Sequence, residues 1–206
     1  MNDPVVENAL DNWIDIESYM SYQAFQIFVD NRDWPGNNIK FWRDHRVGGK
    51  WRWILYDTDF GFGIWDQNAY SVNTLSFALN PDGPGWPNPP WSTFIFRKLI
   101  DNQSFQNLFI NIYCDMLNTV FLPEFIRTRI DSISGNIEEM IPIHVARWFN
   151  DGEWPNSATN WISRLNQMKS FANFRRSYAI MHLMDEFELP SLSQITIART
   201  PDSGGH

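Results

Sequence analysis

Residues 30–63 read DNRDWPGNNIKFWRDHRVGGKWRWILYDTDFGFG and contain the clearest structural signals in the chain. The first part, residues 31–38, is dense in turn-forming residues, and Pro35 prevents a helix from continuing through it. Strand-like runs follow at residues 39–43 and 51–56, joined by a turn that contains Gly48 and Gly49. This order predicts an ordered polar loop, then a β-hairpin, then an acidic segment at the end of the second strand.

Helical patterns dominate most of the remaining chain. Apolar residues three and four positions apart predict helices over residues 12–30, 92–100, 104–121, 123–148 and 160–187. Asp15 and Glu17 form an acidic first turn of the first helix, Ser104 is the expected N-cap of the third, and Pro123 is expected to open the fourth. The fourth helix is expected to break near Gly135 or Pro142. We therefore expect a mainly α fold with a small β-hairpin, in the α+β class.

Two other segments have no helical pattern. Residues 64–91 are rich in Pro, Gly, Asn and Trp, and we expect a long loop that acts as a lid, a binding segment or a structural wrap. Residues 192–199 alternate between apolar and polar side chains, which predicts a strand followed by a turn.

The composition is that of a folded protein with one ordinary domain. The chain has 206 residues, 43% of them hydrophobic and 19% charged, and a formal net charge of −8. Contacts with nucleic-acid phosphates need clusters of Lys and Arg, and because no such cluster occurs we expect no nucleic-acid partner. No long apolar run or signal-peptide pattern occurs, so the sequence predicts no membrane span. Cys114 lies in an apolar run and is expected to be a small buried hydrophobe.

Four polar side chains between residues 33 and 59 form a candidate site. Asp33 and Asn38 are five positions apart, which is the spacing of the base and a metal ligand in the catalytic loop of protein kinases. Asp57 and Asp59 follow the second strand two positions apart, so on an extended strand they would point to the same side. Phosphoryl transfer needs a carboxylate to orient the acceptor hydroxyl and hard oxygen ligands for Mg²⁺. Asp33 suits the first task and Asn38 with Asp57 or Asp59 the second.

Several motifs together resemble the CotH kinases, a family of atypical, secretory-pathway-type protein kinases named for a spore-coat protein. They are Asn12-Trp13-Ile14-Asp15, the loop at residues 31–38, the strand and acidic segment at residues 51–61, and His144-Val145-Ala146-Arg147-Trp148. The resemblance implies ATP-dependent phosphorylation of Ser or Thr hydroxyls in a protein substrate, with Mg²⁺ or Mn²⁺. Carried over, Asp33 would be the catalytic residue, Asn38 and Asp57 the metal and cofactor ligands, and Asp59 a further candidate ligand. An exported location, at the cell surface or in the spore coat, is also implied.

One kinase feature is missing before the loop. Residues 1–31 contain neither Lys nor a glycine-rich turn, although kinases use both to hold the nucleotide phosphates. We therefore expect residues 1–190 to be the C-terminal lobe of a CotH-type domain whose partner is an N-terminal lobe of the same protein. Residues 191–206 would lead into a further segment. Such a fragment is expected to bind nucleotide weakly and to turn over little.

Three other interpretations compete with the kinase hypothesis. Asp57-Thr58-Asp59 also matches the Asp-x-Asp of metal-dependent glycosyltransferases. A carbohydrate-binding or carbohydrate-active domain could use its carboxylates with Trp86 and Trp91, whereas most other tryptophans are expected in the core. A kinase-like lobe could also act as a non-catalytic coat or surface scaffold. His144 and Arg147 could reach the site, but a purely structural role is favoured for both.

Overall fold

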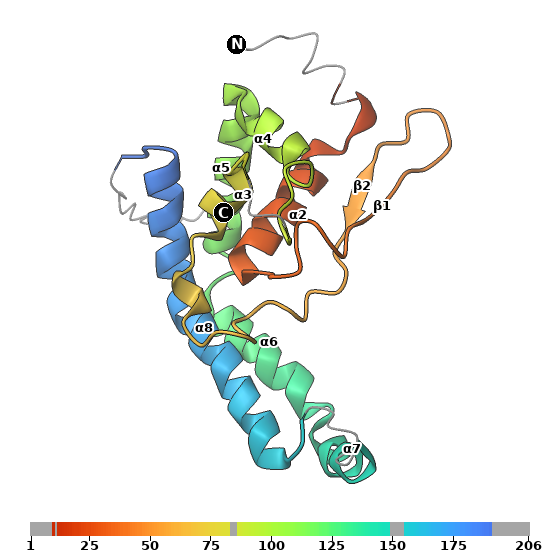
Figure 1. Ribbon diagram of the computed structural model, residues 1–206, viewed down its shortest axis with the longest axis vertical. Coiled ribbons are helices and arrows are strands. Elements are labelled where there is room, and N and C mark those ends of the chain that lie inside the picture. The colour runs from red at the N-terminus through yellow and green to blue at the C-terminus, as the bar shows by residue number, and fades with distance from the viewer. Residues whose placement is uncertain (1–9, 11, 83–85, 149–154, 191–206) are drawn as a thin grey trace, which may run out of the picture.

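The computed structural model describes residue 10 and residues 12–82, 86–148 and 155–190. Helix α2 packs with α3, α5 and the hairpin strand β2, while α6 and α8 lie side by side as an arm that carries α7 at its end (Figure 1). The prediction of a mainly α fold with a small β-hairpin is confirmed. The element bounds are α2 Ile16–Val29, β1 Lys40–Trp42, β2 Arg52–Ile54, η1 Ala69–Ser71, α3 Thr74–Leu79, α4 Phe94–Ile100, α5 Gln103–Leu117, α6 Pro123–Gly135, η2 Glu138–Met140, α7 Ile141–Trp148 and α8 Ala158–Glu186. The strand predicted at residues 192–199 lies outside the described residues.

Helix α2 begins after the predicted start because the residues before it pair with the backbone beside strand β2. Ile14 forms a parallel bridge with Trp51, and the Asp15 backbone N–H donates to the Trp51 carbonyl at 3.0 Å. The Asp15 carboxylate accepts a hydrogen bond from the Ser18 N–H at 3.1 Å and so caps the helix. Asp15 is therefore the N-cap, and only Glu17 provides the predicted acidic first turn.

The other helix ends follow local signals, with one correction. Asn102 rather than Ser104 caps α5, since its side chain accepts from the Ser104 N–H at 2.9 Å. Pro123 opens α6 as predicted, and α6 ends at Gly135, where a break was expected. Pro142 does not interrupt a helix, because it lies in the first turn of α7, where a missing N–H costs no helical hydrogen bond.

The segment at residues 64–91 is more ordered than a long loop. It contains η1 and α3, and Asn73 caps α3 by accepting from the Ser76 N–H at 3.0 Å. Leu75 is buried, and the buried Asn88 side chain donates to the Phe77 carbonyl at 2.7 Å. Of the roles considered from sequence, a structural wrap fits these contacts best.

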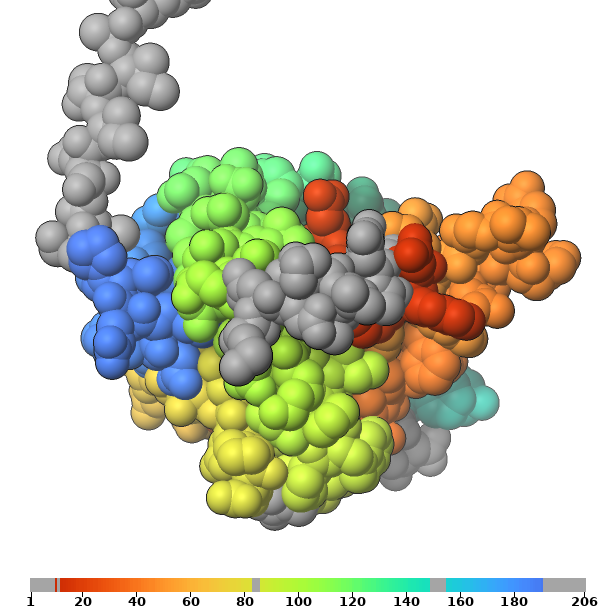
Figure 2. Space-filling view, turned by 90° about the horizontal axis from the view of Figure 1, so that it is seen from above, coloured from red at the N-terminus to blue at the C-terminus, as the bar shows by residue number. Residues whose placement is uncertain are grey.

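The hairpin has one packed face and one open face. β1 and β2 are antiparallel, with Lys40 opposite Ile54, Phe41 opposite Trp53 and Trp42 opposite Arg52. The face with Trp53 packs on α2, where the Trp53 and Tyr19 rings lie 4.4 Å apart. The face with Lys40, Trp42, Arg52 and Ile54 is exposed, and the hairpin projects from the body in orange (Figure 2).

Helix α2 is the centre of the hydrophobic core. Met20, Ala24 and Phe28 are fully buried, and the Phe28 ring stacks on Phe121 at 3.9 Å. Trp34, in the middle of the polar loop at residues 31–38, is also buried. The loop is thereby fixed to the core by an aromatic side chain.

The prediction that most tryptophans pack in the core holds only in part. Trp51 and Trp53 pack against the core, whereas Trp42 and Trp148 are exposed. Trp42 lies on the open face of the hairpin and Trp148 at the end of the arm, so neither is covered by another element.

Candidate active site

The first loop, residues 30–38, starts where α2 ends in a left-handed residue. Asp30 has φ 51°, and its N–H donates to the Ile27 carbonyl at 3.3 Å. Its side chain is buried, where the carboxylate accepts from Thr74 Oγ1 at 2.6 Å and from Arg32 Nε at 2.8 Å. Burial raises the pKa of Asp30, while Thr74, Arg32 and Arg175 act in the opposite direction. The sequence analysis did not single out this buried acid.

Arg175 of α8 fixes the end of α2 from the other side. Its guanidinium is buried, and it donates from Nε to the Phe28 carbonyl and from Nη2 to the Ile27 carbonyl, both at 2.7 Å. These carbonyls lie in the last turn of α2, where the regular i+4 helical donors are missing and the backbone donor to Ile27 is the Asp30 N–H at 3.3 Å. Nη2 also reaches Thr74 Oγ1 at 3.2 Å, the hydroxyl that donates to Asp30. The start of the first loop therefore depends on a contact with α8.

The structure brings Asp33 and Asn38 together. The Asp33 side chain is 7% exposed and accepts a hydrogen bond from Asn38 Nδ2. Asn37 Nδ2 lies 3.0 Å from both carboxylate oxygens, and the Asp33 N–H donates to Asn31 Oδ1 at 3.1 Å. Asn37 is a site residue that sequence reasoning missed, although its position in a turn four residues after Asp33 was a usable signal. These amides hold the Asp33 carboxylate in one orientation.

The second loop, residues 57–63, brings two more carboxylates close to Asp33. A hydrogen bond with Asp59 is the main cause that raises the pKa of Asp57, with further contributions from desolvation and from the charges of Asp59 and Asp33. The charge of Lys40 opposes this shift. The charges of Asp33, Asp59 and Lys40 thus all act on the Asp57 carboxyl group.

The local geometry of the second loop differs from the prediction. β2 ends at Ile54, and Asp57 has φ 50°, so Asp57 and Asp59 do not sit on an extended strand. Their side chains meet because the backbone turns at Asp57 rather than because strand residues alternate. The two acids do approach each other, as the sequence suggested, but the predicted reason, strand alternation, was wrong.

Backbone contacts hold the two loops together. The Arg32 N–H donates to the Phe60 carbonyl at 3.3 Å, and the Phe62 N–H donates to the Val29 carbonyl at 2.9 Å. A Cβ atom on Gly61 would lie 3.0 Å from the Val29 carbonyl oxygen, which is closer than nearly all real contacts. Glycine at this position therefore permits the close approach of the loops.

Helix α8 also anchors the second loop. Gln167 Nε2 donates to the Gly63 carbonyl, and Arg164 Nη1 lies 3.4 Å from the Ile64 carbonyl. A hollow of about 650 Å³ borders this segment, with Asp59 at one wall and Trp65 and Trp161 among its aromatic side chains. The C-terminal part of the second loop is consequently held by contacts with the end of α2 and with α8.

A metal ion would need amide and water ligands in addition to carboxylates. Among the described residues, no three His, Cys, Asp or Glu side chains are arranged to hold a metal. Mg²⁺ commonly takes only one or two protein carboxylates and completes its octahedron with water and substrate phosphates. Asp57, Asp59 and the Asn38 amide oxygen fit that donor set, because Asn38 uses its nitrogen toward Asp33.

His144, Arg147 and Cys114 lie on helices outside the two loops, whereas Trp86 and Trp91 lie closer to them. His144 and Arg147 are on α7, which sits at the far end of the arm, so the prediction of a structural role fits their place (Figure 1). Cys114 is half-buried, and burial raises the pKa of its thiol, which disfavours a nucleophilic thiolate. Trp86 and Trp91 are exposed, but the stretch between them packs on the first loop, because a Cβ atom on Gly36 would collide with the Pro87 carbonyl oxygen.

The comparisons with known proteins identify the family. The family described as "CotH kinase protein" matches residues 2–179, and the chain belongs to this CotH kinase family. No curated protein and no solved structure gave a significant match. Family membership supports a kinase-like function and does not favour the carbohydrate alternative. Within the described ranges, no helix has the length and apolar character needed to cross a bilayer.

Proposed function

We propose that this chain contributes the catalytic base and metal ligands of an ATP-dependent protein kinase that phosphorylates Ser or Thr hydroxyls. The observation that supports this proposal best is the meeting of Asp33, Asn38, Asp57 and Asp59 at two joined loops. Kinase-type phosphoryl transfer needs a carboxylate base beside oxygen ligands for a metal ion, and these four side chains supply both.

Asp33 is the proposed base. Its carboxylate would accept the proton of the acceptor hydroxyl as that oxygen attacks the γ-phosphate. The hydrogen bonds from Asn37 and Asn38 favour this role because they orient the carboxylate before substrate arrives.

Asn38 and Asp57 are the proposed ligands of Mg²⁺ or Mn²⁺, with Asp59 as a further ligand. Besides the hydrogen bond with Asp59 and desolvation, repulsion from Asp59 and Asp33 contributes to the raised pKa of Asp57, and a bound cation would relieve that repulsion. When bound, the metal would neutralise charge on the nucleotide phosphates. The open face of the hairpin adjoins this region, since Lys40 lies 3.6 Å over the Tyr56 ring and acts on Asp57.

This open face would form half of a nucleotide cleft. Trp42, Ile54 and Tyr56 give it an apolar and aromatic surface, and their exposed fractions are 47%, 40% and 38%. The other half, with the phosphate-binding lysine, is assigned to an N-terminal lobe of the same protein. Residues 1–190 would then be the C-terminal lobe, acting on a protein substrate in an exported, cell-surface or spore-coat setting.

Transfer of labelled γ-phosphate by the full-length protein tests the assignment. A Ser/Thr-rich protein should be labelled in the presence of Mg²⁺ or Mn²⁺, and Asp33→Asn should reduce the rate at least about 100-fold. Asp82→Asn is the matched control, because Asp82 is exposed and lies outside both loops. Unchanged labelling by Asp33→Asn would refute the role given to Asp33, and labelling by neither protein would favour the scaffold alternative.

A further inference from the structure

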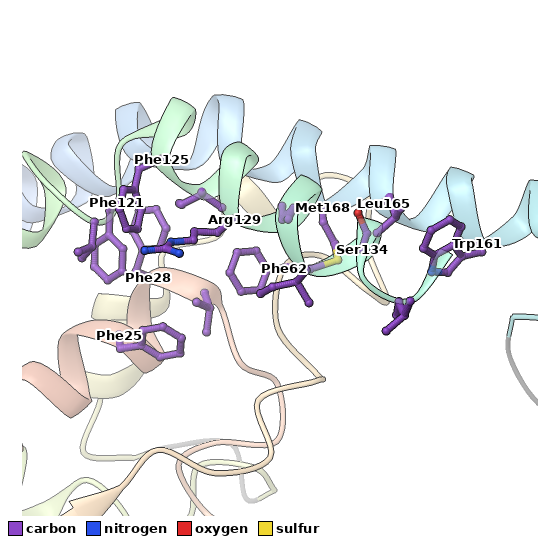
Figure 3. Close-up of a pocket in the computed structure, with 16 residues that line it drawn as sticks. Phe25, Phe28, Phe62, Phe121, Phe125, Arg129, Ser134, Trp161, Leu165 and Met168 are labelled. Carbon is purple, nitrogen blue, oxygen red and sulfur yellow. The ribbon is translucent and has the colours of Figure 1, made fainter. Parts of the chain in front are cut away.

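A second cavity lies between the arm and the body, apart from the four polar side chains of the proposed active site. Its volume is about 440 Å³, and it is lined by α2, α6, α8 and Phe62 of the second loop. Phe28 and Phe121 lie toward one end and Leu165 and Trp161 toward the other, with Phe62 and Met168 between them (Figure 3). Small-molecule sites in proteins have volumes of about 300–1,000 Å³ and mainly hydrophobic and aromatic walls.

We propose that this apolar cavity binds a single-chain amphiphile, an alkyl chain of about a dozen carbons that ends in one anionic group. The inference is independent of the proposed kinase activity, because it uses neither Asp33 nor the carboxylates of the second loop. It rests on the apolar walls, on one arginine and on the size of the cavity.

Arg129 determines the charge of the proposed head group. Among the described residues that line the cavity, Arg129 has the one charged side chain. The other polar side-chain groups of the lining are the Trp161 indole N–H, at the opposite end, and Ser134 Oγ, which already donates to the Asp131 carbonyl at 3.2 Å. The Arg129 guanidinium lies 5.3 Å from the Phe125 ring, and no described carboxylate pairs with it. An anion at this position would give the Arg129 guanidinium a charged hydrogen-bonding partner that the described residues do not provide.

The direction of Arg129 places the two ends of the ligand. Figure 3 shows its side chain extending toward Phe121 and Phe125, at the opposite end from Trp161. The anionic group would therefore lie near Phe125, and the alkyl chain would run past Phe62 and Met168 toward Leu165. No polar side chain interrupts that path except Ser134.

The size of the cavity favours an alkyl chain over a protein helix. A helix about 10 Å wide fills roughly 420 Å³ for each turn, so the cavity would accept only about one turn. One turn offers too few anchors for the helix-in-groove mode, which uses side chains over about two turns. An alkyl chain is much narrower and can bury its whole length in the same space.

Binding of dodecanoate to the chain of residues 1–206, compared with uncharged dodecan-1-ol, tests the proposal. Methyl signals of Met168 and Ile130 should shift on saturation in NMR spectra, whereas Ile95, on α4, should not respond. Affinity should rise about fourfold for each methylene added between octanoate and dodecanoate. Arg129→Gln should weaken dodecanoate about threefold and leave dodecan-1-ol unchanged.

Matched variants on the same helices separate specific from general effects. Ile133→Asp, at a lining residue that is 64% exposed, should weaken both probes at least about tenfold. Ile162→Asp is its control, because Ile162 is 50% exposed on α8 but does not line the cavity. Arg127→Gln is the control for Arg129→Gln, as Arg127 lies on α6 outside the cavity. All four positions are exposed, so the fold should be retained.

Three results would overturn the proposal. The cavity is not an amphiphile site if neither probe shifts the Met168 and Ile130 signals. Association is non-specific if Ile162→Asp weakens binding as much as Ile133→Asp. The anionic head group is wrongly assigned if Arg129→Gln leaves the affinity for dodecanoate unchanged.

Discussion

The Val29 carbonyl accepts a hydrogen bond from the Phe62 N–H at 2.9 Å, and this contact joins the end of α2 to the second loop. Val29 directly precedes the first loop, which carries Asp33, and Phe62 follows Asp59 by three positions within the second loop. The separation of the two acidic loops is therefore set by backbone atoms rather than by the acids themselves.

Gly61→Ala should force the two loops apart. The new Cβ would lie 3.0 Å from the Val29 oxygen and 3.2 Å from the Thr58 oxygen, so the backbone must shift. We expect a loss of about 1–3 kcal/mol in the free energy of unfolding, measured by urea denaturation. Gly135→Ala, at the end of α6 with open space around it, should be neutral or slightly stabilising. Equal effects of the two changes would contradict the steric argument.

Arg175→Met should destabilise the fold more than the same change at its neighbour. It would leave the Ile27, Phe28 and Val72 carbonyls without their buried donor, and we expect a loss of about 3–5 kcal/mol. Arg176 is less buried and donates to the Leu117 carbonyl, so Arg176→Met should cost only about 1 kcal/mol. Urea denaturation of both variants measures the difference. A similar loss of unfolding free energy in both variants would show that the buried hydrogen bonds of Arg175 contribute no more than those of Arg176.

Asp30 should make the protein less stable as pH rises. Burial raises its pKa in the folded state, so the folded protein holds the Asp30 proton more tightly than the unfolded chain does. The free energy of unfolding should fall as pH rises from the unfolded pKa, about 3.9, through the folded pKa. Asp30→Asn keeps an acceptor for Thr74 and should remove this part of the pH dependence, whereas Asp82→Asn should not. Urea denaturation between about pH 3 and 7 tests this, and identical slopes in all three proteins would refute it.

Mn²⁺ should bind at the second loop in competition with protons. The raised pKa of Asp57 means that protonation opposes metal binding at a higher pH than for an ordinary aspartate. Paramagnetic broadening of the amide signals of residues 57–59 and the Asn38 side chain should weaken as pH falls. Asp57→Asn should reduce the broadening strongly, and Asp82→Asn should leave it intact. Broadening that persists in Asp57→Asn would remove Asp57 from the ligand set.

The fold could be predicted where local signals decide it. The hairpin, the helical segments, the break after Gly135 and Pro123 at the start of α6 all follow from turn residues, helical periodicity and proline geometry. The order of α3 within residues 64–91 was missed because it depends on burial of Leu75 and Ala78 against the core. Hydrophobic contacts between distant segments are not visible in a short window of sequence.

The residues of the candidate site could be proposed from the sequence, but the backbone turn and the distant contacts that position them could not. Asp33, Asn38, Asp57 and Asp59 were found from spacing and residue type, and the structure places them at two loops in contact. The turn at Asp57 was missed because a positive φ at an aspartate has no reliable sequence signal. Arg175 was missed because it lies 147 residues from the carbonyl of Phe28, and nothing near either residue indicates the contact.

The separation of 147 residues between Phe28 and Arg175 has a consequence for when the site forms during synthesis. A ribosome delivers α2 and both acidic loops long before α8, and domains acquire their final packing only when the contacting segments are available. Until Arg175 has left the ribosomal exit tunnel, the Ile27 and Phe28 carbonyls lack the guanidinium donor that α8 supplies. The acidic loops of the nascent chain therefore lack this anchor from α8, while the contacts between the loops and the end of α2 involve only earlier residues, and the support of the site is completed when α8 packs.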